Sequence, residues 1–194
     1  MHPPDYNLKL LQAMLESLES LLLSGQVFWT LGVQSPAGTT PYPQLSLGSL
    51  LMLLDELAAQ ELGMSQKQRE RWEQLRQEYE IACAKRLAGL GRKAAQELGT
   101  RINLWQAYLG DLEDRPEAAE DYSREVANRL KAARLLDLAR PSADALKAES
   151  RLDALDRRLG LRFRRGEFVW DETLTHVYTA DSYPYLYGRP RADD

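Results

Sequence analysis

Apolar residues recur at helical spacing along most of this chain, and the longest such stripe extends from Trp72 to Leu112. A period of three or four residues keeps one face of an α-helix turned toward a partner over roughly 60 Å, at ~1.5 Å rise per residue. The stripe contains Trp72, Leu75, Tyr79, Ala82, Leu87, Leu90, Ala94, Leu98, Ile102, Trp105, Leu109 and Leu112. The sequence therefore predicts one long central helix that several shorter helices cover.

Ser65 and Gln68 have the spacing of a capping box at the start of this predicted helix. Gly89, Gly91 and Gly99 fall inside the helix, and each glycine costs up to ~1 kcal/mol relative to alanine. Because the apolar stripe stays in phase across all three glycines, we predict one continuous or bent helix. A kink is expected near Gly89–Gly91.

Shorter helices are predicted on both sides of the long one, and a glycine or a proline ends each of them. They run from Leu8 to Gly25, from Ser46 to Gly63, from Asp114 to Pro141 and from Ser142 to Gly160. Ser46 can cap the second of them. The segment 34–44 contains three prolines and one glycine, so we predict a loop there.

The pattern changes after Gly160, where helical spacing gives way to alternating arginine and aromatic residues. This alternation predicts a small hairpin that turns at Arg165 and Gly166. The following segment Tyr183–Gly188 contains one proline among tyrosines and is expected to be extended. Such a tail either docks a partner or seals the end of the core, and both alternatives stay open at this point.

The predicted fold is all-α: an elongated bundle of about five helices around one long central helix, with a small C-terminal hairpin and an extended aromatic tail. Residues 1–160 are expected to form the helical bundle. Residues 161–194 are expected to form the hairpin and tail, packed on the bundle within a single domain overall.

The composition is typical of a soluble globular protein, since 44% of the 194 residues are hydrophobic and 28% are charged. The formal net charge of −4 argues against a dedicated nucleic-acid-binding protein. Cys83 is the only cysteine, which excludes an intrachain disulfide and a thiolate metal cage. We find no signal peptide and no apolar run long enough to span a bilayer, and we expect a cytoplasmic protein without membrane contact.

The sequence lacks the motifs of the common catalytic and metal sites. Its two histidines, His2 and His176, are far apart, and neither belongs to the Glu-x-x-His pair of di-iron bundles. A glycine-rich phosphate loop after a strand and a Gly-x-Ser-x-Gly elbow are also missing. We therefore expect a non-catalytic protein without a cofactor or a metal site.

One polar set on the long helix is a candidate ligand site. It comprises Arg101, Asn103, Trp105, Tyr108 and, from the following helix, Arg129. Residues three or four apart share one flank of a helix, and an arginine beside aromatic rings can hold a carboxylate or a phosphate. The alternative is an inter-helix network of salt bridges between these arginines and Asp111, Glu120 or Glu125.

A second candidate is an arginine cluster near residue 160 that surrounds Phe163. Its members are Arg157, Arg158, Arg162, Arg164 and Arg165. Such a cluster can hold a nucleic-acid backbone or an acidic partner. The alternative is a solvated helix end, where cations complement the helix dipole.

The leading hypothesis for function is a non-catalytic helical interaction or assembly protein, an adaptor or subunit whose partner is another protein or a second copy of itself. It rests on the long apolar stripe, part of which is expected to face another chain. The alternative is a bundle that binds a small anionic ligand between Arg101 and Arg129, with or without enzymatic activity. Nucleic-acid binding through the Arg157–Arg165 cluster ranks third.

Overall fold

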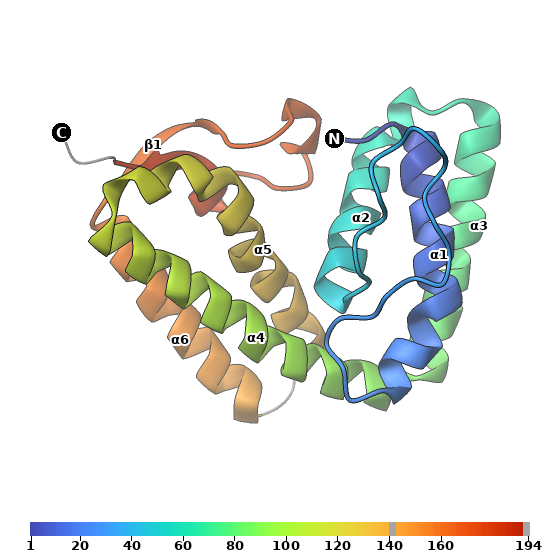
Figure 1. Ribbon diagram of the computed structural model, residues 1–194, viewed down its shortest axis with the longest axis horizontal. Coiled ribbons are helices and arrows are strands. Elements are labelled where there is room, and N and C mark those ends of the chain that lie inside the picture. The colour runs from blue at the N-terminus through green and yellow to red at the C-terminus, as the bar shows by residue number, and fades with distance from the viewer. Residues whose placement is uncertain (140–142, 192–194) are drawn as a thin grey trace. The chain divides into compact units, whose positions relative to one another are not determined.

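The computed structural model describes residues 1–139 and 143–191 and is 71% helical (Figure 1). Its helices are α1 (Pro4–Leu23), α2 (Leu47–Gln60), α3 (Gln66–Lys85), α4 (Leu87–Asp114), α5 (Tyr122–Ala139) and α6 (Ala143–Gly160). Two strands, β1 (Phe163–Phe168) and β2 (Tyr187–Pro190), form an antiparallel pair near the C-terminus. The predicted all-α fold with a C-terminal hairpin is confirmed.

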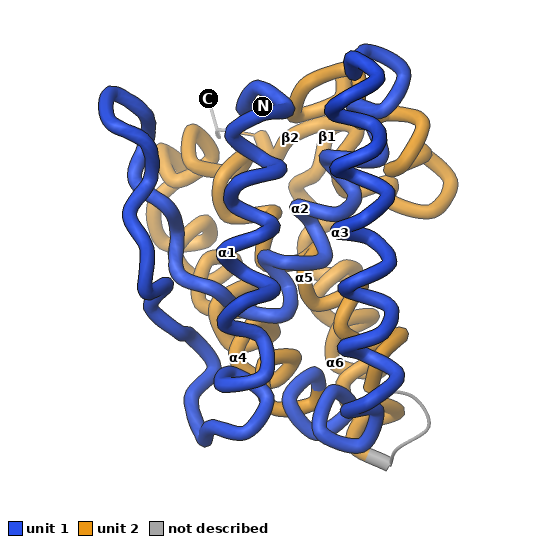
Figure 2. The backbone as a smooth tube through the Cα atoms, turned by 90° about the vertical axis from the view of Figure 1, so that its right-hand side faces the viewer, with its two compact units in different colours: residues 1–94 blue, residues 95–194 orange. Residues whose placement is uncertain are grey.

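The chain forms two compact units, residues 1–94 and residues 95–194, which Figure 2 colours separately. Each unit has its own buried core. The predicted division of the chain at residue 160 stays a prediction.

In the first unit, α1 packs against α2 and α3 through leucines. Leu11 and Leu18 of α1, Leu50 and Leu57 of α2, and Leu75 of α3 are at most 1% exposed. Leucine covers more than one face of α2, as expected for the helix with the highest share of buried residues.

Both predicted N-terminal caps in the first unit are present. The Ser46 side chain accepts a hydrogen bond from the Ser49 backbone N–H at 3.2 Å, which satisfies a free donor at the start of α2. Ser65 and Gln68 form the full capping box at the start of α3. These helices therefore begin where side-chain acceptors were expected from the sequence.

The predicted long helix is wrong in one respect, because it is divided at Arg86. α3 ends at Lys85, Arg86 leaves helical geometry with φ −126° and ψ 27°, and α4 begins at Leu87. The step from Ala82 to Leu87 is five residues, which takes Leu87 out of phase on a helix of 3.6 residues per turn. Leu87 is accordingly 71% exposed.

The first turns of α4 complete the core of the first unit. Lys93 is 4% exposed, and its ammonium group donates to the carbonyl oxygens of Ser24 and Gln26, each at 2.7 Å. These carbonyls follow directly after α1. The buried lysine therefore satisfies backbone acceptors at the end of that helix and complements its dipole.

In the second unit, the rest of α4 packs with α5 and α6, and the hairpin lies at the end of α4 (Figure 1). Trp105 of α4 and Tyr122 of α5 are fully buried at the centre of this unit. The Arg162 guanidinium donates to the carbonyl oxygen of Leu112 at 3.2 Å and ties the start of the hairpin to the last turn of α4.

The aromatic tail is packed onto α5. The Tyr122 hydroxyl donates to the carbonyl oxygen of Tyr185 at 2.5 Å, and the Trp170 indole N–H donates to that of Ser123 at 2.7 Å. Tyr185 and Leu186 are at most 6% exposed. They lie in a short 3₁₀ turn, Pro184–Leu186, so the tail is not extended there as predicted. Of the two alternatives for the tail, the structure favours a seal on the core.

The hairpin does not turn at Arg165 and Gly166, as the sequence predicted. Both residues lie inside β1, and the partner strand β2 begins only at Tyr187. A register shift between Arg165 and Phe168 bends β1 at this point, so the glycine marks a bulge rather than a turn.

Of the helices that the structure describes, none combines the length and the apolar character that a membrane crossing requires.

Candidate functional site

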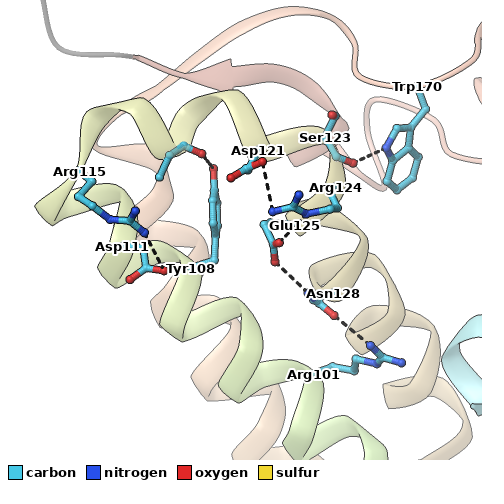
Figure 3. Close-up of polar contacts among 11 residues, drawn as sticks. Arg101, Tyr108, Asp111, Arg115, Asp121, Ser123, Arg124, Glu125, Asn128 and Trp170 are labelled. Carbon is cyan, nitrogen blue, oxygen red and sulfur yellow. Dashed lines mark hydrogen bonds and ion pairs between the residues drawn. The ribbon is translucent and has the colours of Figure 1, made fainter. Parts of the chain in front are cut away.

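The predicted ligand residue Arg101 lies at the buried end of a row of polar contacts (Figure 3). Its guanidinium is 2.9 Å from the carboxylate of Glu97, one turn earlier on α4, and also donates to the Asn128 side-chain oxygen of α5 at 3.0 Å. The side chains of Arg101 and Glu97 are 7% and 0% exposed. The positive charge is therefore compensated inside the unit.

The row continues along α5 toward the surface. Asn128 donates to Glu125 at 3.3 Å, and Arg124 contacts both Glu125 at 3.0 Å and Asp121 at 3.2 Å (Figure 3). Glu125 is one of the carboxylates that the network alternative named. The arrangement of these residues favours that alternative, and ligand binding around Arg101 stays a prediction.

The other members of the predicted ligand set on α4 point to different surroundings. Trp105 and Tyr108 stack at 5.5 Å in the core, and the Tyr108 hydroxyl donates to the Ala118 carbonyl oxygen at 3.2 Å. Burial, with the nearby Glu125 carboxylate, raises the pKa of Tyr108 and keeps its hydroxyl neutral. Asn103 is exposed and accepts a hydrogen bond from Arg151 at 2.9 Å.

Arg129, the last member, forms a bidentate ion pair with Asp156 of α6, at 2.8 and 2.6 Å. Its guanidinium also lies 4.4 Å from the centre of the Tyr185 ring, a cation–π geometry. Asp156 and Tyr185 line a pocket of about 280 Å³ together with Phe163. Arg129 thus joins α5, α6 and the tail, and its charge is compensated by a carboxylate.

The second candidate, the arginine cluster, separates into two groups. Arg158 pairs with Glu113 of α4, and this hydrogen bond lowers the pKa of the Glu113 carboxyl. Arg162 bonds to α4 as described above, and Arg157 is exposed on α6. Of the predicted members, Arg164 and Arg165 remain on β1.

Arg164 and Arg165 lie in a groove with two arginines that sequence reasoning missed, Arg189 and Arg191. The groove has a volume of about 640 Å³. Its lining residues are Arg164, Arg165, Gly166, Glu167, Phe168, Gly188, Arg189, Pro190 and Arg191. We call this feature the arginine groove.

Strand pairing brings Arg164, Arg189 and Arg191 to one face of the hairpin, whereas Arg165 also lines the pocket with Asp156 and Tyr185. Arg164 lies directly opposite Arg189 in the antiparallel register, and the Arg191 N–H continues the ladder by donating to the Arg162 carbonyl oxygen at 2.8 Å. Pro190 is buried whereas Arg189 and Arg191 are exposed, as expected from the alternation of side chains along a strand.

The charge of the arginine groove is not compensated within the part of the chain that the structure describes. Among those residues, none of the four arginine side chains takes part in an ion pair or a hydrogen bond. The lining contains a single described carboxylate, that of Glu167. Like charges directly across two strands are destabilising, so the pair Arg164 and Arg189 is expected to lower the stability of the hairpin slightly.

Gly188 is the residue that allows the two strands to approach. Its φ is +143°, a conformation that side chains disfavour, and a Cβ atom there would lie 2.1 Å from the Arg164 carbonyl oxygen. The same atom would lie 2.8 Å from the Phe163 ring. Glycine at this position therefore sets the close register that aligns Arg164 with Arg189.

A weak signal for the missing half of the groove was present in the sequence. The pattern Arg-x-Arg occurs at 162–164 and again at 189–191. Pairing of two strands that are far apart in the sequence cannot be deduced from either segment alone, and the expected turn at Gly166 assigned β1 a different partner.

Two further kinds of site were tested against the structure. Across residues 1–139 and 143–191, no group of three or more His, Cys, Asp or Glu side chains is arranged to hold a metal ion. Cys83 is half-buried in α3, and burial raises the pKa of its thiol, which disfavours the reactive thiolate.

Comparisons with protein-family models, with curated proteins and with solved structures found no match for this chain.

Proposed function

We propose that this protein is a non-catalytic interaction protein that binds a phosphate-bearing polyanion through the arginine groove. The observation that carries the proposal is the convergence of Arg164, Arg189 and Arg191 on one groove of about 640 Å³, with no ion pair to any of them among the described residues. Arg165 borders the groove from the next position of β1. The proposal keeps a non-catalytic binding protein but departs from the leading hypothesis in the partner, which was another protein or a second copy of this chain. The proposed binding surface is on the hairpin.

Arginine is suited to this ligand because its planar guanidinium matches two phosphate oxygens at once. Phosphate also removes the unfavourable contact between Arg164 and Arg189, since an anion between two cations replaces repulsion by attraction. The binding energy is therefore expected to include relief of a repulsion that is present in the free protein.

The net charge of −4 does not oppose a local site of this kind. Exposed charges more than a Debye length apart are screened, and that length is about 8 Å at physiological ionic strength. A polyanion in the groove is therefore affected mainly by the arginines around it.

The alternative of a small anionic ligand between Arg101 and Arg129 has less support, because each of these arginines already contacts a carboxylate. Self-association stays a prediction that solution mass measurements test directly.

The test of the proposed function is binding of inorganic polyphosphate of defined length, measured by isothermal titration calorimetry at several salt concentrations. The triple variant Arg164→Gln, Arg189→Gln, Arg191→Gln is expected to bind about 100-fold more weakly at low salt. In a plot of log affinity against log salt concentration, the slope of this variant is expected to be smaller in magnitude by about three, one for each lost arginine contact.

A matched control removes three arginines from α3, of which Arg69 and Arg76 are exposed and Arg71 is half-buried, as Arg69→Gln, Arg71→Gln, Arg76→Gln. It changes the net charge of the chain by the same amount, so its affinity is expected to stay within about twofold of the original protein. Equal weakening in both triple variants would mean that polyphosphate responds to overall charge, and the groove assignment would be wrong.

A further inference from the structure

We infer that the polyanion bound in the arginine groove is single-stranded nucleic acid, with a base stacked on Phe168. This inference rests on the proposed function and names its ligand. Phe168 lines the groove beside the arginines and is only half-buried, so part of its ring surface faces the space where the ligand would lie.

Neighbouring rings hold Phe168 in place. Its ring centre lies 5.1 Å from that of Tyr187 and 6.2 Å from that of Trp170, the latter edge to face. Trp170 is itself fixed by its hydrogen bond to Ser123, and the Tyr187 hydroxyl donates to the Tyr178 carbonyl oxygen at 2.8 Å. A ring that is already ordered loses little conformational entropy when a base stacks on it.

The bulge in β1 determines where this ring lies. Arg165 pairs with Gly188, and the next registered pair is Phe168 with Tyr187, so Gly166 and Glu167 are the extra residues on β1. Bulges of this kind redirect side chains. Here the bulge places an aromatic ring at the end of the row of arginines.

Positive charge together with an available aromatic ring distinguishes single-stranded nucleic acid from other polyanions. Each base offers a flat π-surface, and stacking on aromatic side chains tolerates any sequence. In a duplex the bases are already stacked on one another, and an acidic peptide has no comparable surface. The arginines can bind all of these ligands, whereas stacking on Phe168 favours the single strand.

The experiment compares four phosphate-bearing probes and one acidic peptide by fluorescence anisotropy, or by competition with the labelled oligonucleotide, on the full chain at one salt concentration. The probes are a twelve-nucleotide oligo(dT), an abasic chain of the same length, a twelve-base-pair duplex and polyphosphate. The oligo(dT) is expected to bind about tenfold more tightly than the abasic chain, as loss of one stacked base implies. An oligo(Glu) peptide of twelve residues is expected to compete poorly.

The variant Phe168→Leu keeps an apolar side chain but removes the ring. It is expected to bind oligo(dT) as weakly as the abasic chain while its affinity for polyphosphate is unchanged. The control Phe163→Leu alters the other aromatic residue of β1, whose ring lies 6.0 Å from that of Tyr122, and is expected to keep the preference for oligo(dT).

Equal binding of oligo(dT) and the abasic chain, or tighter binding of the duplex or of oligo(Glu), overturns the inference. If polyphosphate still binds in that case, the proposed function stands. If polyphosphate does not bind either, both the proposed function and this inference are wrong. If Phe168→Leu does not fold, the comparison of probes on the original protein decides the question alone.

Discussion

The buried pair between Glu97 and Arg101 yields the most direct test of how the second unit is stabilised. The variant Arg101→Met removes the guanidinium but keeps an unbranched chain that packs in the same space. It leaves the Glu97 carboxylate, which is 0% exposed, without its partner at 2.9 Å.

Removing one partner of a buried ion pair costs up to about 3–5 kcal/mol, because the remaining buried charge loses part of its compensation. The unfolding free energy of a natural domain is about 5–15 kcal/mol, so this loss is a large share of the total. A second variant, Arg101→Met with Glu97→Leu, removes both charges. It is expected to be more stable than Arg101→Met alone, since an apolar replacement of a whole buried pair is often neutral.

The matched control lies at the other end of the same row of contacts. Arg124 is 72% exposed and pairs with Glu125 and Asp121, so Arg124→Met is expected to cost only about 0.2–1 kcal/mol. Both variants lose one guanidinium from one network. Burial is therefore the main difference between them.

Urea unfolding followed by circular dichroism and by tryptophan fluorescence measures these losses. The free energies are comparable only where both probes show one coincident transition. A cost for Arg101→Met that does not exceed that of Arg124→Met would refute the reasoning. So would a double variant whose cost equals the sum of the costs of Arg101→Met and Glu97→Leu, each measured alone.

Three further predictions concern single features of the structure. Gly188→Ala is expected to lower the free energy of unfolding by about 1–3 kcal/mol through backbone strain alone and to abolish polyphosphate binding. An unchanged calorimetric titration with polyphosphate would contradict the role of this glycine. Lys93→Met leaves two carbonyls after α1 without their ammonium donor and is expected to cost about 1–3 kcal/mol in urea unfolding; a loss below 0.5 kcal/mol, the usual limit for surface substitutions, would contradict this. Burial raises the pKa of Tyr122 and Tyr185, so folding retains protons that the unfolded chain releases above about pH 10. These two groups are therefore expected to leave the unfolding free energy unchanged below about pH 10. Above about pH 10 the unfolding free energy is expected to fall by about 1.4 kcal/mol per pH unit for each tyrosine, and Tyr122→Phe is expected to show a smaller fall per pH unit.

Local signals in the sequence predicted the helical framework well. Ser46 and the pair Ser65 and Gln68 mark helix starts through hydrogen bonds within four residues, and such short-range chemistry is legible without a structure. The apolar period likewise identified the buried faces of the helices. Its single five-residue step, from Ala82 to Leu87, was the visible sign of the break at Arg86.

The candidate site was less predictable because it depends on pairing between distant segments. Arg164 was named from its neighbours on β1, whereas Arg189 becomes its partner only through the strand register. Arg101 carried the opposite ambiguity. An arginine near aromatic residues fits a ligand site and a buried network equally well, and the hydrogen bond to Asn128 on another helix favours the network.

The geometry at Gly188 also has an evolutionary consequence. Two constraints of different origin act on neighbouring positions of β2. Residue 188 must be glycine to let the strands approach, whereas Arg189 is required by the proposed binding of a polyanion. In homologous chains, glycine at 188 is therefore expected to persist even where the ligand has changed or binding has been lost. Arg164 and Arg189 are expected to be replaced together, because either one alone leaves half of a site. A lineage that keeps the glycine but varies both arginines would mark the point at which the hairpin was retained for its structure alone.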